Sequence, residues 1–245
     1  FCLFFLVFFT TTIFTFSNEL EFELLSTDFS GIFRSGNTIL IYGKHGIINY
    51  SNDLGINWKQ AFVGVNNDVL KIISVDDKFY ALTPEKIYVS KDQGKSWEET
   101  SIHWEQNFVD FCTDGNQIFV VTDNEILSID KELKSDLNLL FQFDTFTKFT
   151  EMTVWQKYLF IIDANISIVK FNVLTKAPED TLFTGFATQK IEKLKVRDST
   201  IFVLLVSNEH SPSIEFDYQF IRHSVLFSED FGKTWKIFAK DIPLT

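Results

Sequence analysis

The chain contains little cysteine, proline, glycine and arginine for its length. Of its 245 residues, two are Cys, four are Pro, ten are Gly, and the only arginines are Arg34, Arg197 and Arg222. The scarcity of Pro and Gly excludes collagen-like and low-complexity disordered chains, and two cysteines exclude a disulfide-stapled scaffold. Basic residues are outnumbered by acidic ones, giving a formal net charge of −11. This balance disfavours nonspecific binding to nucleic acid or anionic lipid.

Phe, in contrast, is abundant, with 29 copies, and Val, Ile, Thr and Tyr recur along the chain. Aromatic and β-branched side chains pack well on pleated, half-buried surfaces, so this composition favours strands. A chain of this length can bury a large core, and all-β proteins of this size often form one domain. We therefore predict an all-β fold, with residues 18–245 as a single domain.

The first 16 residues are all apolar or Thr, and the first charged residue is Glu19. This pattern is typical of a secretory signal peptide, with Thr15 and Ser17 as the small residues before the cut. We interpret 1–17 as a partial signal peptide and predict a protein that is secreted or located in the periplasm or cell envelope. The alternative is an uncleaved anchor, although the run is short for a membrane span. After cleavage only Cys112 remains, and we predict that it is a small buried hydrophobic residue.

One eight-residue pattern, Ser-x-Asp-x-Gly-x-polar-Trp, occurs three times in the chain. The copies span 51–58, 90–97 and 228–235. The pattern resembles the Asp-box, or bacterial neuraminidase repeat, of β-propellers. That resemblance implies four-stranded blades in which each box is a structural turn between the two outer strands. The defining residues are Ser51, Asp53, Gly55, Trp58, Ser90, Asp92, Gly94, Trp97, Ser228, Asp230, Gly232 and Trp235.

A second signal, a polar turn followed by a short apolar strand, recurs with nearly the same period of about 40 residues. The strands begin at Ile39, Phe79, Ile118, Leu159 and Ile201, which we call the anchors. Repeats of this length that consist of short strands indicate propeller blades of four strands. We predict five blades, at about 27–60, 61–100, 101–140, 141–182 and 183–240.

Five blades either complete a ring or, as we expect, belong to a six- or seven-bladed ring. The alternating run 19–26 is a candidate for an outer strand that closes the ring. In the third and fourth units the box is lost, although Ser128-Ile-Asp130 is a possible remnant with Glu132 where Gly would stand.

The residue types of the box suit a tight turn. Gly supplies a positive φ without a Cβ clash, and the Asp carboxylate can accept backbone N–H groups within the turn. We expect the Trp that follows to wedge between neighbouring blades and to bury a large apolar area. A single carboxylate per turn falls short of a calcium site, so we interpret the box as structural.

In such a blade the boxes mark one face, and the opposite face usually binds ligands. Loops predicted there supply our candidate binding residues, and the fifth blade adds an insertion at 207–221 that is longer than any other such loop. The candidates are His45, Glu85, Asp123, Glu125, Asp163, His210 and Tyr218.

The sequence gives weaker signals for a catalytic site than for the fold. Sialidases, which carry Asp-boxes, need an arginine triad, and Arg34 and Arg197 are predicted on the face opposite the loops. A glycoside hydrolase needs two facing carboxylates, and Asp123, Glu125 and Asp163 could face one another across blades. The four histidines lack the spacing of a metal site, so we predict neither a metal nor another cofactor.

The run from Gly43 to Asp53 is similar to photosystem II assembly and stability factor-like propellers, although their arginine patch is not evident. Sortilin-type receptor domains and xyloglucan-active hydrolases are more distant in resemblance. We predict an exported, non-catalytic propeller that binds a protein, peptide or glycan as a monomer. It would bind no nucleic acid and would not insert into a membrane after cleavage. The alternative is a glycan-active hydrolase that uses carboxylates of the binding face.

Overall fold

The computed structural model describes residues 29–64, 67–144, 147–164, 166–184, 189–197, 199–212 and 217–242. The predicted signal peptide and the alternating run 19–26 lie outside the described residues. None of the helices in the described part of the chain is both long and apolar enough to cross a membrane.

The chain forms five antiparallel sheets of four strands, and within each sheet the strands pair in chain order. Blade 1 comprises β1 (Phe29–Ser35), β2 (Thr38–Gly43), β3 (Ile47–Ser51) and β4 (Lys59–Phe62), with the 3₁₀ turn η1 (Lys44–Gly46) between β2 and β3. Blade 2 comprises β5 (Lys71–Val75), β6 (Lys78–Leu82), β7 (Ile87–Ser90) and β8 (Glu98–Glu99). Blade 3 comprises β9 (Asp110–Thr113), β10 (Gln117–Val121), β11 (Glu125–Asp130) and β12 (Asn138–Gln142).

The last two blades follow the same plan with longer strands. Blade 4 comprises β13 (Phe149–Trp155), β14 (Tyr158–Asp163), β15 (Ser167–Asn172) and β16 (Ala177–Thr184). Blade 5 comprises β17 (Gln189–Arg197), β18 (Thr200–Pro212), β19 (Asp217–Ser228) and β20 (Lys236–Ile242).

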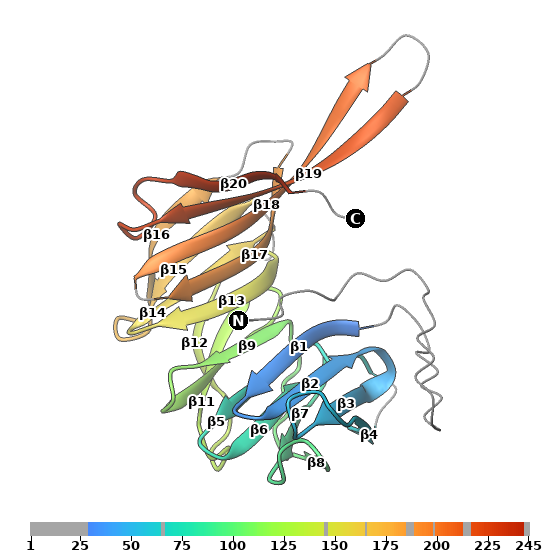
Figure 1. Cartoon of the computed structure of the whole chain (residues 1–245). Coiled ribbons are helices and arrows are strands. Elements are labelled where there is room, and N and C mark those ends of the chain that lie inside the picture. The colour runs from blue at the N-terminus through green and yellow to red at the C-terminus, as the bar shows by residue number, and fades with distance from the viewer. Residues whose placement is uncertain are drawn as a thin grey trace, which may run out of the picture.

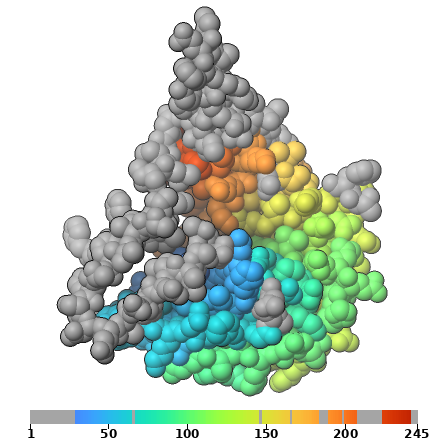
Figure 2. Space-filling view, turned by 90° about the vertical axis from the view of Figure 1, so that its right-hand side faces the viewer, coloured from blue at the N-terminus to red at the C-terminus, as the bar shows by residue number. Residues whose placement is uncertain are grey.

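Successive blades pack through their first strands, with β1 against β5, β5 against β9, β9 against β13 and β13 against β17. These inner strands surround the centre of the molecule, and the remaining strands of each blade extend outward (Figure 1). Figure 2 shows the chain passing from blue through green and yellow to orange around one side of the molecule. The predicted β-propeller of five four-stranded blades is therefore confirmed.

The core consists of four apolar clusters, one between each pair of successive blades. Side chains alternate along the second strand of each blade, so Phe79 faces blade 1 whereas Tyr80 faces blade 3. Both faces of a middle strand are thus buried, which explains why the strands that begin at the anchors are continuously apolar. Cys112 is buried in the cluster between blades 3 and 4, as predicted.

Tight turns with a left-handed residue join the first two strands of blades 1 to 4. That residue is Gly36 (φ 58°) in blade 1, Asp76 (φ 51°) in blade 2, Gly115 (φ 93°) in blade 3 and Gln156 (φ 53°) in blade 4. Each stands three residues before its anchor, so the predicted period reflects one turn that recurs in each blade.

Candidate functional site

The connections of each blade alternate between two faces because consecutive strands run antiparallel. The turns after the first and third strands lie on one face, which we call the back. The turns after the second strand and the linkers between blades lie on the other face, which we call the front. The Asp-boxes follow the third strands and are therefore on the back.

In each box the Ser and Asp side chains satisfy the backbone of the turn. The Ser51 hydroxyl donates to Asp53 Oδ1 (2.7 Å) and accepts the N–H of Gly55 (2.8 Å). Asp53 also accepts the backbone N–H of Asn57 (2.9 Å), which is the main reason why the pKa of Asp53 falls to about 2. The same network recurs at Asp92 and Asp230. The box carboxylates thus serve the turn itself, as the structural interpretation predicts.

The Gly and Trp of the box have a second role, which is to contact the preceding blade. A Cβ on Gly94 would lie 2.7 Å from the Leu40 side chain of blade 1. A Cβ on Gly232 would lie 2.8 Å from the Leu182 side chain of blade 4. Trp97 and Trp235 pack against the clusters that their blades share with those same neighbours. The box therefore seals the junction between two blades as well as closing a turn.

Blade 3 keeps the carboxylate of the box although its Gly and Trp are lost. Asp130 Oδ2 accepts the backbone N–H (2.9 Å) and the hydroxyl (2.6 Å) of Ser135. The bond from the Ser135 hydroxyl is the largest cause that lowers the pKa of Asp130 to about 2. The turn is one residue longer than in the intact boxes, because Ser135 follows Asp130 by five positions whereas Asn57 follows Asp53 by four. The remnant predicted at 128–130 is therefore a functioning turn clamp.

Three of the predicted binding residues are exposed on the front, in the turns after the second strands: His45, Glu85 and Asp123. His45 adopts a left-handed conformation (φ 58°), and its backbone N–H donates to Asp68 Oδ1 (3.3 Å) in the linker between blades 1 and 2. The backbone carbonyl of Asp123 accepts the N–H of Phe149 (2.9 Å). These residues come from three different blades, and their side chains are open to solvent.

Glu125 and Asp163 are bonded to interblade linkers instead. Glu125 is buried, and its Oε2 accepts the indole N–H of Trp104 (2.7 Å). Asp163 Oδ1 accepts the backbone N–H of Lys148 (3.0 Å). Both carboxylates therefore fasten a linker to the turn beside it.

His210 and Tyr218 lie on a hairpin formed by β18 and β19. The predicted insertion is paired from Ser207, opposite Arg222, to Pro212, opposite Asp217. Pairing with the flanking strands ends earlier: β17 pairs with β18 as far as Ser207, and β20 pairs with β19 as far as His223. The hairpin consequently extends well beyond the body of the propeller (Figure 1).

Four charged residues that we did not predict lie at one equivalent position of the inner strands of blades 2 to 5. This position, which we call the entry position, pairs with the residue of the second strand that stands three residues after the anchor. Its occupants are Gly31, Lys71, Asp110, Glu151 and Lys193. Each stands eight residues before its anchor, so the sequence did contain a signal for them.

Entry-position side chains fasten each blade to the next. Asp110 Oδ2 accepts the backbone N–H of Met152 (2.6 Å), and Glu151 Oε2 accepts that of Leu194 (3.2 Å). Gly31 has no side chain, but the Tyr42 hydroxyl lies where its Cβ would be and accepts the N–H of Ile72. An oxygen thus satisfies the equivalent N–H group in three of the four junctions, those between blades 1 and 2, 3 and 4, and 4 and 5.

In blade 2 the entry position holds a hydrogen-bond donor instead of an acceptor. Lys71 Nζ lies 2.9 Å from Asp110 Oδ2 and donates to the carbonyl of Met152 (3.1 Å). Burial, the largest single effect, would lower the pKa of Lys71, but the acidic groups around it, Asp110 first among them, together outweigh burial and the pKa is raised. Burial raises the pKa of Glu151, whose nearest cation, Lys193, is 4.0 Å away.

Blade 5 differs from the others along the whole of its inner strand. On the same face of β17 as Lys193 lie Lys195 and Arg197, two and four residues further on, and all three are exposed. The equivalent residues of blade 2, Ile73 and Val75, are buried against blade 3. Although the protein is acidic overall, the inner strand of blade 5 thus presents a row of exposed cations.

Comparison with known proteins agrees with this geometry. A family model for the BNR-Asp box repeat matches residues 87–100 and 227–237, which contain the second and third boxes. The chain is an Asp-box β-propeller. No curated protein matches it in sequence.

Solved structures resemble this Asp-box propeller in fold at low sequence identity. YCF48 from Cyanidioschyzon merolae is 16% identical with a TM-score of 0.58, over 85% of this chain and 71% of that one. A structure of YCF48 bound to D1 peptide is 15% identical with a TM-score of 0.61, over 85% of this chain and 66% of that one. An ancestral GH74 enzyme is 9% identical with a TM-score of 0.62, over 87% of this chain and 32% of that one. The likeness therefore concerns the fold, and the chain spans about two thirds of each YCF48 chain.

Proposed function

We propose that this propeller is an exported, non-catalytic scaffold that holds an extended acidic segment of a partner protein against the inner strand of blade 5. Its fold supports a binding role, since YCF48 is a propeller of similar fold whose structure with a D1 peptide is known. The ligand itself is inferred from the chemistry of blade 5.

The row of Lys193, Lys195 and Arg197 carries the proposal. Alternate residues on a strand lie about 6.7 Å apart on one face, so the row presents three positive charges at the spacing of a second strand. The Lys193 side chain is 68% exposed, which leaves its ammonium group accessible. Since the chain has a net charge of −11, such a concentration of cations favours an acidic ligand over other peptides.

Aromatic rings continue the same face of the sheet away from the centre. Phe202 is paired with Lys195 on the neighbouring strand and stacks on Phe227, with ring centroids 6.2 Å apart. Phe227 in turn contacts Phe238 at 6.2 Å, and Phe238 is 69% exposed. A segment in which acidic and apolar residues alternate would match both the cations and the rings.

A direct test measures binding of a fluorescent peptide with the sequence Glu-Val-Glu-Phe-Glu-Val-Val, in which acidic residues alternate with apolar ones. We expect saturable binding that weakens strongly between 50 and 500 mM salt (about tenfold or more), because exposed charges are screened. A peptide of the same composition with its three Glu residues in succession should bind more weakly. Equal binding of the two peptides would contradict the proposed spacing.

Charge reversal at Lys195 locates the site. Lys195→Glu should reduce the affinity at least tenfold, since it replaces an attraction with a repulsion at the centre of the row. Lys59→Glu makes the same charge change on the exposed outer strand of blade 1 and serves as the matched control. If both variants bind like the unaltered protein, the cationic row is not the binding surface.

Export is tested separately from binding. N-terminal sequencing of the protein isolated from its own cells should yield a mature chain that begins at Asn18. Recovery of the intact apolar run would instead indicate an anchor.

A further inference from the structure

A groove of about 720 Å³ lies on the back of the molecule between blades 1 and 2. Its walls are the turns after β1 and β5 and the boxes that follow β3 and β7. Polar residues dominate the lining, among them Asn37, Asn52, Asp77, Gln93 and Lys95. A volume of this size is within the usual range of small-molecule sites.

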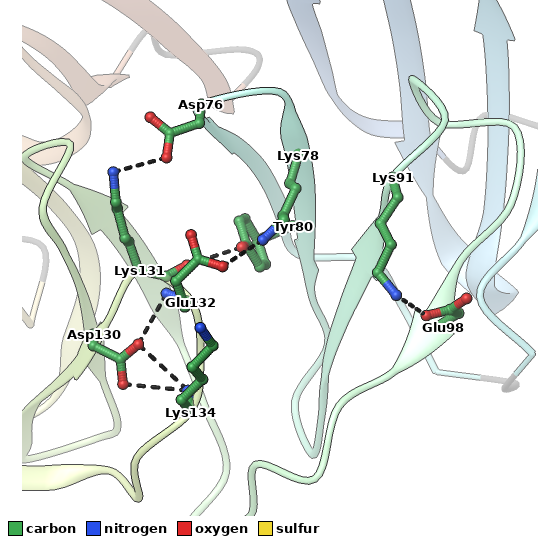
Figure 3. Close-up of polar contacts among 9 residues, drawn as sticks. All are labelled: Asp76, Lys78, Tyr80, Lys91, Glu98, Asp130, Lys131, Glu132 and Lys134. Atoms are coloured by element: carbon green, nitrogen blue, oxygen red, sulfur yellow. Dashed lines mark hydrogen bonds and ion pairs between the residues drawn. The ribbon is translucent and has the colours of Figure 1, made fainter.

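Ion pairs occupy the equivalent place between blades 2 and 3. Asp76 lies 2.8 Å from Lys131, Lys78 lies 2.6 Å from Glu132, and the Tyr80 hydroxyl donates to the carbonyl of Lys131 at 2.9 Å (Figure 3). These contacts bridge the turn after β5 and the clamp after β11.

Small or uncharged residues replace the bridging groups between blades 1 and 2. Gly36 stands where Asp76 stands in the next blade, three residues before the anchor, and Thr38 stands where Lys78 does. Gln93 directly follows Asp92 of the box, just as Lys131 directly follows Asp130, so Gln93 and Lys131 hold equivalent positions. In place of the ion pairs, the Thr38 hydroxyl donates to Gln93 Oε1 (3.5 Å) across the two blades, and the groove beside this contact is open.

The groups left for a ligand are nearly neutral in sum. Asp92 is bonded within its own box, and Asp76 and Lys91 pair with Lys131 and Glu98. What remains is one carboxylate, Asp77, one ammonium group, Lys95, and three carboxamides. Thr38 Oγ1 lies 2.9 Å from Asn52 Oδ1, which fixes one of these carboxamides in place.

We propose that the groove binds a short neutral saccharide. Each carboxamide offers two N–H donors and a carbonyl acceptor, and each sugar hydroxyl can both donate and accept a hydrogen bond. Carboxamides can therefore satisfy sugar hydroxyls without any net charge. The lining has three carboxylates and two ammonium groups, an excess of one negative charge that is too small to select an ionic ligand. This site lies on the opposite face from the loops predicted to bind, and it is independent of the acidic segment proposed for blade 5.

The probes are three neutral oligosaccharides of different linkage, namely maltotetraose, cellotetraose and chitotetraose, observed by saturation-transfer NMR and titration. We expect at least one of them to bind with a dissociation constant of about 1 mM or lower. Asn37→Ala and Asn52→Ala should each weaken that binding about fivefold, because each removes hydrogen bonds to hydroxyls. Absence of binding by all three at 20 mM (about twenty times that constant) would overturn the proposal.

A second variant closes the groove by copying the bridged junction. Gly36→Asp combined with Thr38→Lys places the charges of Asp76 and Lys78 between blades 1 and 2, and Asp76 already adopts the left-handed conformation required (φ 51°). The matched control, Asn116→Asp with Gln117→Lys, adds the same charges to the equivalent turn of blade 3. We expect binding to be lost in the first variant and kept in the control. Unchanged binding in the closed variant would overturn the assignment, and Asn37→Ala decides the matter if that variant does not fold.

Discussion

The inner strands β9 and β17 occupy equivalent places in their blades but face different surroundings. In β9, Asp110 and Cys112 are buried against blade 4, and Asp110 is shared between Lys71 and the backbone of Met152. In β17, Lys193, Lys195 and Arg197 occupy the positions equivalent to Asp110, Cys112 and Asp114 and are exposed. One strand fastens two blades together, and the other presents charge. The difference teaches that the same position of an inner strand can hold a buried contact between blades or an exposed charge, depending on what packs against it.

The largest effect should come from the apolar side of β9. Phe111 is fully buried and contacts the cluster between blades 2 and 3. Phe111→Ala should lower the free energy of unfolding by about 3–5 kcal/mol, as for other buried Phe residues. Ile32 holds the equivalent position in blade 1 but is 59% exposed, so Ile32→Ala should cost less than about 1 kcal/mol. Urea unfolding of both variants checks this contrast, and similar losses would contradict it.

The second largest effect on stability should come from the entry position. Asp110→Ala leaves the Lys71 ammonium and the Met152 N–H without their acceptor, so we expect a loss of about 3 kcal/mol. Lys193→Ala removes an exposed charge at the equivalent position and should change stability by less than about 0.5 kcal/mol. Thermal unfolding separates the two cases. A large loss in Lys193→Ala would mean that β17 is fastened as β9 is.

Glu151 allows a smaller, pH-dependent test. Its pKa is raised above 4.5 because burial disfavours the charged form, so its protonation stabilises the folded state. That contribution is present below the unfolded pKa of about 4.3 and is lost as the pH rises through the folded pKa. Glu151→Gln keeps an acceptor for the Leu194 N–H and should therefore raise stability at pH 7 by up to about 1 kcal/mol. At pH 4 the variant and the unaltered protein should unfold alike, and an equal gain at both values would exclude titration as the cause.

The Asp-boxes predict the opposite pH dependence and the smallest effect. The pKa of Asp230 is lowered from 3.8 to about 2, chiefly by the Thr234 hydroxyl. Its contribution to stability is present above the unfolded pKa and is lost as the pH falls from about 4 towards 2. Asp230→Asn should therefore flatten part of the acid limb of a stability curve measured between pH 5 and 2. An unchanged limb would show that this exposed turn contributes nothing to acid unfolding.

The sequence alone was sufficient for the fold because its signals are local. The box closes within eight residues, through bonds such as Ser51 to Asp53 and Asn57 to Asp53, and its residue types are visible in any one copy. The anchors recur because the second strand of each blade lies within the sheet, and in blades 2 to 4 it is buried on both faces. The five blades and the structural role of the boxes were therefore predictable.

The candidate site was less predictable, since its contacts join residues far apart in the chain. The loops supplied His45, Glu85 and Asp123 on the front, but Glu125 and Asp163 turned out to hold linkers. Lys193 and Lys195 of β17 lie on a strand and carry no loop signal, although the entry position stands eight residues before each anchor.

By itself, the sequence determined the turns, the strand period and the residues that seal each turn, since these depend on hydrogen bonds and conformational preferences within a few residues. Only the tertiary structure decided which charges are buried and which are presented. Lys71 meets Asp110 from 39 residues away and Asp110 meets Met152 from 42, so burial depends on how neighbouring blades pack. The open groove between blades 1 and 2 has the same origin, because it lies where Gly36, Thr38 and Gln93 take the places of the residues that bridge blades 2 and 3.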